Sequence, residues 1–212
     1  MKFQALGHAC FAVTTKEGTC VLFDPFEEGI GYPVPRVRAD IVCLSHDHYD
    51  HNNAAAADGS PQILRTTAEA SFGGVRIFGV PCFHDDAHGA LRGENIIFIM
   101  EADGMRIAHM GDIGHMLSKE QIAAIGPIDV LMIPVGGTFT VDADGAAELT
   151  RAIDSRVTIP MHYQTARLTL GKPLAPLGDF IKHFTNVTEL ETDTFTVEKD
   201  DGKSGIFVPN VE

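Results

Sequence analysis

The segment Ser45-His46-Asp47-His48-Tyr49-Asp50-His51-Asn52 decides the fold class of this chain. It directly follows residues 41–44, a continuous apolar run that predicts a strand covered on both faces. The polar segment therefore occupies the carboxyl end of that strand, where open sheets build their sites. Three imidazoles and two carboxylates between positions 46 and 51 cannot pack a core, because each needs a polar partner once desolvated. We interpret the segment as a metal-binding loop.

The spacing of the donors in this loop favours two ions. In an extended loop His46 and His48 point the same way and can bind one ion. Asp50 and His51, after the chain turns into a helix, can face a second ion. Histidine and aspartate together suit zinc, iron or manganese, whereas calcium requires oxygen donors alone. The alternative interpretation is an incidental histidine cluster on a surface loop.

Two ions need more donors than this loop supplies. His84 follows the strand predicted at residues 75–80, Asp112 follows a strand at 105–109, and His162 follows a strand at 157–160. Each position is weak evidence by itself, because a lone histidine at a strand end is more often a surface residue or a hydrogen-bonded packing residue. Together with the loop at 46–51 they form a set that one rim of a sheet could assemble.

The order HxHxDH, then His, then Gly-Asp, then a late His after an apolar strand resembles the metallo-β-lactamase superfamily. The similarity is greatest to the small stand-alone metal-dependent hydrolases related to the ascorbate-phosphate lactonases. It extends over nearly the whole chain, through motifs at residues 7–9, 23–25, 46–51, 109–112, 134–138 and 159–163. The resemblance implies an α/β fold, a four-layer αββα sandwich, as one domain over residues 1–212.

The resemblance also implies a ligand set. His46, His48 and His84 hold the first ion, Asp50, His51 and His162 hold the second, and Asp112 bridges both. Two divalent ions are expected, with zinc first and manganese or iron as alternatives. A hydroxide between the ions then attacks an ester, lactone or phosphodiester of a small molecule. Asp50, or an adjacent free histidine, moves the proton.

Two departures from relatives narrow the function. Classical β-lactamases of this fold carry a cysteine where Asp112 stands, and the diiron oxygen-reducing branch carries a carboxylate where His48 stands. We therefore favour hydrolysis of another substrate over antibiotic hydrolysis or diiron redox chemistry. A non-catalytic metal-binding or sensor protein remains the alternative outside enzymes.

Other residues have weaker assignments. His8 and His109 match histidines of the resembled branch and could orient ligands, contact substrate or only pack at a strand end. Asp24 could orient a ligand imidazole or only cap its turn. His88 and His115 are expected to be surface residues. Rim loops at 26–38, 84–94, 113–118, 136–142 and 163–175 should choose the substrate, with Arg167 or Lys172 as candidates to bind an anionic group.

Composition sets the remaining expectations. The net charge of −13 disfavours nucleic acid and membrane surfaces as partners, which leaves a small-molecule substrate, with homo-oligomerisation left open. The four cysteines form no CxxC pair and favour a reducing, cytoplasmic location. No apolar run is long enough for a signal peptide core or a membrane span.

The pattern of apolar runs predicts many strands and few helices. Strands are expected at 3–6, 10–14, 20–23, 41–44, 75–80, 95–101, 105–109, 130–133, 157–160, 194–198 and 205–208. Ser118 should cap a short helix, Asp142 a helix over 143–153, and Asn52 a helix start, with a further helix at 177–184. Residues 18–44 and 104–134 share the same order of a strand, an acidic turn and a buried strand. This weak internal repeat predicts two β-rich halves that face each other.

Overall fold

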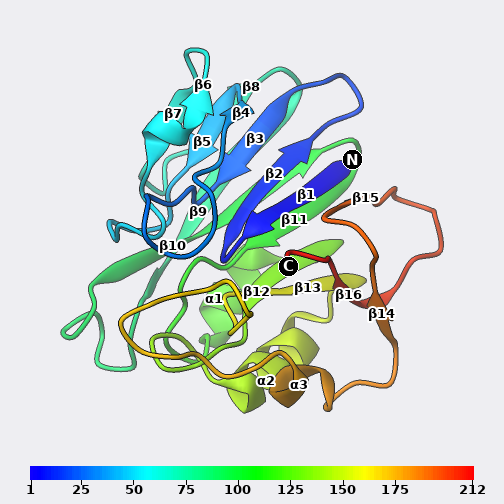
Figure 1. Cartoon of the computed structure of the whole chain (residues 1–212). Helices are drawn as coiled ribbons and strands as arrows, with labels where there is room; N and C mark the ends of the chain where they lie inside the picture. Colours follow the sequence, from blue (N-terminus) through cyan, green and yellow to red (C-terminus); the bar gives the residue numbers. More distant parts are fainter.

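In the computed structural model, which describes residues 1–212, two β-sheets pack face to face (Figure 1). The first sheet has strand order β15-β1-β2-β3-β5-β7, and the second has the order β14-β16-β13-β12-β11-β10-β9-β8. The first sheet consists of β1 (Lys2–Gly7), β2 (Cys10–Thr14), β3 (Cys20–Phe23), β5 (Ile41–Cys43), β7 (Gln62–Leu64) and β15 (Thr194–Thr196). The second consists of β8 (Ala70–Phe72), β9 (Val75–Phe83), β10 (Glu94–Ala102), β11 (Met105–His109), β12 (Val130–Pro134), β13 (Val157–Met161), β14 (Val187–Glu189) and β16 (Gly205–Val208).

The main core lies between the sheets. It joins 24 buried residues, and strand β1 shows how they are selected: Phe3 and Ala5 point inward while Lys2 on the same strand is exposed. This alternation follows from the period of two in a β-strand. Strand β5 is buried along its whole length, because β3 and β7 flank it in parallel and both of its faces are covered. The sequence predicted this strand from its continuous apolar run.

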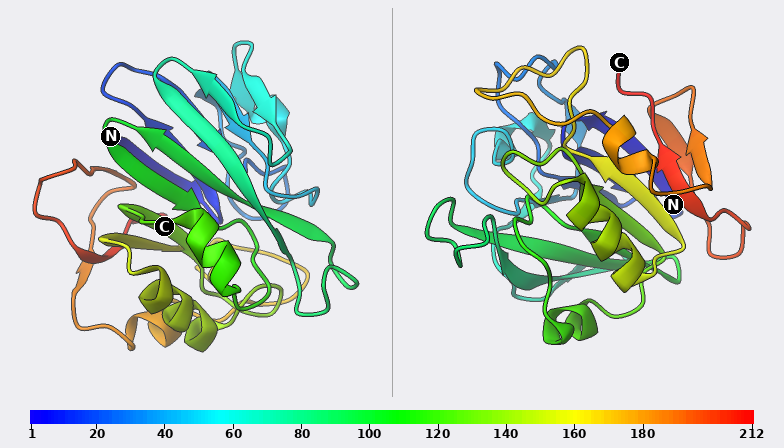
Figure 2. Two further views of the ribbon diagram at one scale, coloured as in Figure 1. Left: turned by 180° about the vertical axis from the view of Figure 1, so that it is seen from behind. Right: turned by 90° about the horizontal axis from the view of Figure 1, so that it is seen from below.

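The helices cover the outer face of the second sheet (Figure 2). Helix α1 (Lys119–Ile125) begins with the predicted capping box of Ser118 and Gln121, and α2 (Ala143–Ile153) begins at Asp142, whose carboxylate accepts from the amide of Gly145. The third predicted helix is shorter than expected, α3 (Gly178–Ile181). None of the helices is both long and apolar enough to cross a membrane.

The layer over the first sheet consists of loops, whereas helices were expected there. A cluster that includes Phe26, Ile30, Leu168 and Leu174 covers this face, and these residues come from loops rather than from an α-helix. The helix expected after Asn52 is a single 3-10 turn, η1 (Ala54–Ala56), and no side chain caps it. The chain turns away at Ala57 into the small β4 (Val37–Arg38) and β6 (Ala57–Asp58) pair, so an α-helix cannot propagate.

The weak internal repeat of the sequence corresponds to a structural unit that occurs twice, a hairpin followed by a parallel strand. In the first half, the β2–β3 hairpin is followed by β5, which pairs with β3 in parallel. In the second half, the β10–β11 hairpin is followed by β12, which pairs with β11 in parallel. The backbone turns after β3 and β11 are bonded alike, from Asp24 N to Cys43 O at 2.9 Å and from Met110 N to Met132 O at 3.0 Å. Asp24 and Asp112 therefore follow equivalent strands of the two sheets.

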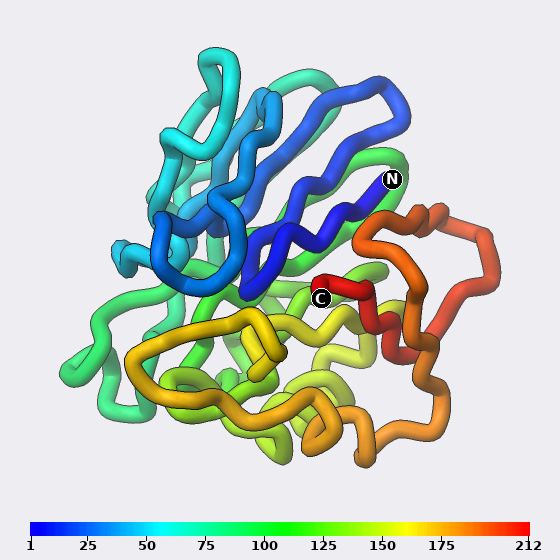
Figure 3. The backbone as a smooth tube through the Cα atoms, in the orientation of Figure 1, coloured from blue at the N-terminus to red at the C-terminus, as the bar shows by residue number.

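Because of the directions of the strands, the loops that follow six of them begin at the same end of the sandwich. Strands β3, β5 and β7 are parallel, as are β11, β12 and β13. Because β1 and β9 are each separated from these sets by one antiparallel neighbour, they run in the same directions as β3 and β11. The segments after β1, β3, β5, β9, β11 and β13 consequently meet at a single rim, and the tube in Figure 3 lets the reader follow each to that end.

Candidate metal centre

Three imidazoles gather on one side of the rim. His46 and His48 follow β5, and His84 follows β9 of the opposite sheet. Their rings lie edge to face or tilted, with centroids 4.6 Å apart for His46–His48, 4.7 Å for His46–His84 and 5.0 Å for His48–His84. One nitrogen from each ring lies within 4.8 Å of the others. This spacing fits three nitrogen donors around a single ion, each about 2.0–2.1 Å from it.

A second cluster lies beside the first. Asp50, His51 and His162 offer donor atoms within 4.8 Å of one another, and His8 joins the same group. Nε2 of His8 lies 3.2 Å from Oδ2 of Asp50, and the His8 and His162 rings are 4.2 Å apart. The structure brings the expected ligands together in these two groups and adds His8 to the second, while Asp24, His46 and His51 form a third group of donors that overlaps both.

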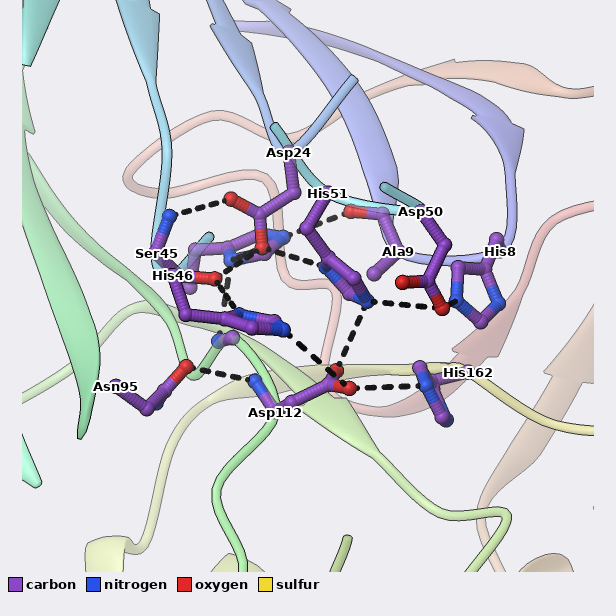
Figure 4. A network of polar contacts seen from close by, with 12 residues as sticks. His8, Ala9, Asp24, Ser45, His46, Asp50, His51, Asn95, Asp112 and His162 are labelled. Atoms are coloured by element: carbon purple, nitrogen blue, oxygen red, sulfur yellow. Dashed lines mark hydrogen bonds and ion pairs between the residues drawn. The ribbon is translucent and has the colours of Figure 1, made fainter. Parts of the chain in front are cut away.

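Asp112 lies between donors of the two clusters, and Figure 4 shows it between His46 of the first cluster and His51 and His162 of the second. Its Oδ2 is 3.2 Å from Nε2 of His84 and 3.1 Å from Nε2 of His162, while its Oδ1 is 3.3 Å from Nε2 of His51. Nε2 of His46 is 4.0 Å from Oδ2. A carboxylate in this position can contact an ion in either cluster.

The buried donors in these clusters lack other partners. Nε2 of His46, Nε2 of His51, Nε2 of His162 and Oδ1 of Asp112 are buried without a hydrogen bond. Leaving one such group unpaired costs about 1–3 kcal/mol, so native proteins rarely tolerate several together. Transition-metal ions accept this set of nitrogen and carboxylate donors, so the residues fit a metal centre.

Asp24 orients two of the imidazoles from behind. Its Oδ2 accepts a 3.0 Å hydrogen bond from Nδ1 of His51, which leaves Nε2 of that ring facing the cluster. It also accepts at 2.6 Å from the hydroxyl of Ser45, whose oxygen lies 2.9 Å from Nδ1 of His46. Because its oxygens are already bonded to His51 and Ser45, Asp24 acts as a support for ligands rather than as a ligand itself.

Asp112 is positioned by a residue that the sequence analysis missed. The buried side chain of Asn95 accepts from the amide of Asp112 at 2.9 Å and donates to the carbonyl of Met110 at 2.9 Å. Gly111 between them has a φ of 54°, and a Cβ at this position would collide with Asn95 and Ser45. The sequence signal was only the glycine before Asp112; nothing local marks Asn95.

Three residues of the rim have left-handed backbone conformations. His8, Asp24 and His162 have φ values of 55°, 42° and 53°, a region that side-chain-bearing residues rarely adopt. Such conformations persist only where the surrounding structure holds them, and they concentrate at functional sites. Here the amide of His162 donates to the carbonyl of His8 at 3.1 Å, so the two turns support each other.

Three further histidines lie outside the two donor clusters: His88, His109 and His115. His109 is fully buried, stacks on Phe23 with centroids 5.1 Å apart, and donates from Nε2 to the carbonyl of Ala9 at 2.8 Å. It therefore holds the turn that carries His8 and is not a ligand. His115 accepts from the amide of Phe83 at 3.1 Å, and His88 is exposed.

The charge distribution inside the site favours metal binding. Burial, followed by repulsion from His51, lowers the pKa of His46 to about 3, and burial, followed by repulsion from His162, lowers that of His8 to about 4. Both rings are therefore neutral at pH 7. Desolvation opposes ionisation of Asp112, but His162 and His51 hold its pKa well below 3.8. Asp112 in turn outweighs desolvation and raises the pKa of His51 well above 6.5.

A pocket of about 300 Å³ opens onto the two clusters. Its lining combines metal-site residues with an arginine and several apolar side chains: His48, Tyr49, Asp50, His84, Arg92, Asp112, Phe139, Leu170 and Gly171. Arg167, one of the two cations expected to meet an anion, lines a different hollow beside Glu212, and Lys172 is absent from the lining. The basic residue at the pocket is instead Arg92, in the loop after β9.

Comparisons with known proteins agree with the fold and with the motifs. The sequence profile of the family described as the β-lactamase superfamily domain matches residues 2–162. A UPF0173 metal-dependent hydrolase of Thermoplasma volcanium is 30% identical over 196 residues, which cover 79% of this chain and 86% of that protein. The chain belongs to the metallo-β-lactamase superfamily.

Solved structures extend the comparison to the whole chain. A crystal structure from Thermotoga maritima, described as a candidate Zn-dependent hydrolase of the metallo-β-lactamase superfamily, superposes with a TM-score of 0.82 at 34% identity and covers 98% of this chain and 97% of that one. A candidate metal-dependent hydrolase from Parabacteroides distasonis shares the fold, with a TM-score of 0.68, 17% identity and coverage of 99% of this chain and 93% of that one. Both neighbours share the fold over nearly the whole of this chain.

Proposed function

We propose that this protein is a hydrolase that uses two divalent metal ions, zinc foremost, to cleave an ester, lactone or phosphodiester of a small molecule. The observation that carries the proposal is the position of Asp112, which lines a pocket and lies between two donor clusters with unpaired buried atoms. The names of the relatives, which are metal-dependent hydrolases, support the reaction class.

The ligand assignment follows from the grouping of the donors. His46, His48 and His84 would hold one ion, Asp50, His51 and His162 the other, and Asp112 would contact both. Ions bound in this way lower the pKa of water to about 7 and polarise a carbonyl or phosphoryl oxygen. The nitrogen-rich donor set favours zinc, with manganese or iron as alternatives.

Asp50 is the residue that we assign to proton transfer. It lines the pocket, and its side chain is 13% exposed, so it can meet substrate and water. Desolvation would neutralise it, but the hydrogen bond from His8 and the positive charge at His51 hold its pKa below 3.8. It is therefore a carboxylate at neutral pH, and whichever of its oxygens is not bound to an ion can accept a hydrogen bond from a water molecule and pass the proton toward solvent.

The volume of the pocket and the choice of metal ion distinguish the proposed hydrolase from the alternative functions. A volume of about 300 Å³ suits a small molecule rather than a macromolecular chain. A non-catalytic metal sensor needs the clusters but no turnover, and a diiron redox protein needs redox-active iron. Turnover with a redox-inert ion such as zinc therefore separates the hydrolase from both.

The test is metal analysis followed by a substrate panel. Protein purified without chelator should contain about two transition-metal ions per chain and should hydrolyse a member of a panel of bis(4-nitrophenyl) phosphate, aryl esters, lactones and thioesters. Chelation should abolish turnover, and added zinc or manganese should restore it. A chain that remains metal-free in added Zn²⁺ and Mn²⁺, or activity that survives in Asp112→Ala, would disprove the proposal.

A further inference from the structure

The guanidinium of Arg92 stands at the pocket without an ionic partner. It is half-buried, lines the same pocket as Asp50, His84 and Asp112, and pairs with no carboxylate within 4.0 Å. The other pocket residues that the metal clusters do not use are Tyr49, Phe139, Leu170 and Gly171. An arginine has five N–H donors and carries its charge at every physiological pH. Most of that donor capacity is unused here.

The existing contacts of Arg92 orient its guanidinium but leave most of its N–H groups without an acceptor. Nη2 donates a long bond of 3.3 Å to the carbonyl of Thr138, and Cζ lies 5.8 Å from the centre of the Phe139 ring. Both partners belong to the loop over residues 136–142. The guanidinium therefore rests on an aromatic side chain, a common arrangement where arginine binds a carboxylate or phosphate in two-pronged fashion.

The backbone around Arg92 is anchored to a ligand-bearing segment. Asp85, adjacent to His84, accepts four backbone hydrogen bonds: Oδ1 from Ala87 and Gly89 at 2.8 Å each, and Oδ2 from Leu91 at 3.0 Å and Arg92 at 2.7 Å. The loop that carries Arg92 is thus held by the residue next to a metal ligand. Such support from a buried carboxylate holds the backbone of Arg92 in place relative to His84, as a substrate-positioning residue requires.

The charge of the whole chain makes this arginine informative. With a net charge of −13, the surface repels anions at long range, so an anionic substrate needs a local cation at the pocket. We infer that Arg92 binds an anionic group, a carboxylate or a phosphate, located on the part of the substrate away from the bond that is cleaved. The inference rests on the proposed function and adds a substrate class to it: the ester, lactone or phosphodiester carries a second, negatively charged group, and Phe139 and Leu170 contact the apolar segment between the two.

Binding measurements can test Arg92 without turnover. The probes are two matched pairs on the zinc-loaded protein, glutarate with pentanoate and adipate with hexanoate, since each pair shares one carboxylate and a chain length. The second carboxylate should make the diacid of at least one pair bind about tenfold tighter, because a charge-assisted hydrogen bond to a guanidinium is stronger than a bond between neutral groups. In Arg92→Gln this advantage should fall below about twofold, and Arg92→Lys should be intermediate.

Controls separate recognition from bulk charge and from loop structure. Arg167→Gln removes the same charge from a different hollow and should keep the full diacid advantage. Amide exchange of Gly89 and Leu91 in Arg92→Gln should match that of the unaltered protein, since Asp85 holds those amides. An equal diacid advantage in Arg92→Gln and the unaltered protein, or none in either, would overturn the inference.

A kinetic arm distinguishes this inference from the proposed function. The ratio of kcat/KM for mono-4-nitrophenyl adipate to that for 4-nitrophenyl hexanoate should exceed about tenfold and should collapse in Arg92→Gln. If neither these esters nor the wider panel is cleaved while Arg92-dependent diacid binding persists, the hydrolase proposal fails and the anion site stands. If the esters are cleaved with one ratio in both proteins, the hydrolase stands and the anion site fails.

Discussion

Nδ1 of His51 donates a 3.0 Å hydrogen bond to Oδ2 of Asp24, and both side chains are fully buried. The bond fixes which nitrogen of His51 faces the second cluster. Asp24 reaches His46 of the first cluster as well, through the Ser45 hydroxyl. One carboxylate behind the site therefore orients a donor atom in each of the two clusters.

Replacement of Asp24 should weaken metal binding without removing a ligand. We expect Asp24→Asn to lower zinc affinity by about 10- to 100-fold, the usual effect of losing a carboxylate behind a ligating histidine. Competition with a chromophoric chelator measures this. Asp40→Asn is the matched control, because Asp40 accepts from the amide of Cys20 at 2.9 Å in the same sheet but does not contact the ligands. Equal losses in both variants would contradict a specific role for Asp24.

Replacement of Asp112 should affect both ions, whereas replacement of His84 should affect one. Two divalent ions a few ångströms apart repel strongly, and a shared carboxylate offsets that repulsion. We expect Asp112→Ala to lose both tightly bound ions and turnover, and His84→Ala to retain about one ion, in the cluster of Asp50, His51 and His162. Metal titration followed by elemental analysis distinguishes these outcomes. If Asp112→Ala keeps two tight ions, Asp112 does not bridge the clusters.

Metal affinity should rise with pH because a proton on His51 competes with the ion for that imidazole. Asp112 raises the pKa of His51 well above 6.5 despite desolvation, so below that raised pKa an ion must displace the proton from His51. The same proton stabilises the metal-free fold at low and neutral pH, and this contribution is lost as the pH rises through the raised pKa. Zinc affinity of the second cluster should increase by up to about tenfold per pH unit between about pH 6 and pH 8. Calorimetry in buffers of different ionisation enthalpy should detect the released proton, and an equal heat in all buffers would refute this assignment.

The Asp85 anchor should make the stability of the 85–92 loop dependent on pH. Desolvation opposes ionisation, but the amides of Arg92, Gly89, Leu91 and Ala87 lower the pKa of Asp85 to about 2. A depressed carboxyl pKa stabilises the fold above the unfolded value of about 3.9, and that contribution disappears as the pH falls toward the folded value. Asp85→Ala should therefore lower Tm at pH 7 and speed exchange of the Gly89, Leu91 and Arg92 amides, and the Tm difference should shrink below about pH 4. Exposed Asp86→Ala serves as the control, and a Tm difference that stays constant with pH would count against the anchor.

The sequence was most informative where the signal was local. The donors at positions 46, 48, 50 and 51 lie within one short loop, so their spacing alone indicated two groups. The buried strand before them and the caps at Ser118 and Asp142 were also predicted, because apolar runs and capping residues act over a few positions. The short edge strands β7, β8 and β14 were missed, since each has only three residues and little burial.

The supporting residues could not be predicted in the same way. Asn95 approaches Asp112 only because β10 pairs between β9 and β11, and Arg92 reaches the pocket only because Asp85 folds its loop. These relationships depend on long-range pairing and on a turn without a distinctive sequence signature. Arg167 and Lys172, the cations that we expected near the substrate, do not line this pocket: Arg167 lines a different hollow, and only their neighbours Leu170 and Gly171 reach the pocket.

The bond from the amide of His162 to the carbonyl of His8 has a consequence for how the protein is made. Translation delivers His8 well before His162, which follows β13, so the second cluster stays incomplete until β13 has been made. Fragments that end before β13 should carry the histidine loop at 46–51 yet fail to retain a second ion. Under the proposed metal assignment, full occupancy therefore requires a finished and correctly docked polypeptide, and zinc shortage should leave chains in which the turns at His8 and His162 are less firmly joined.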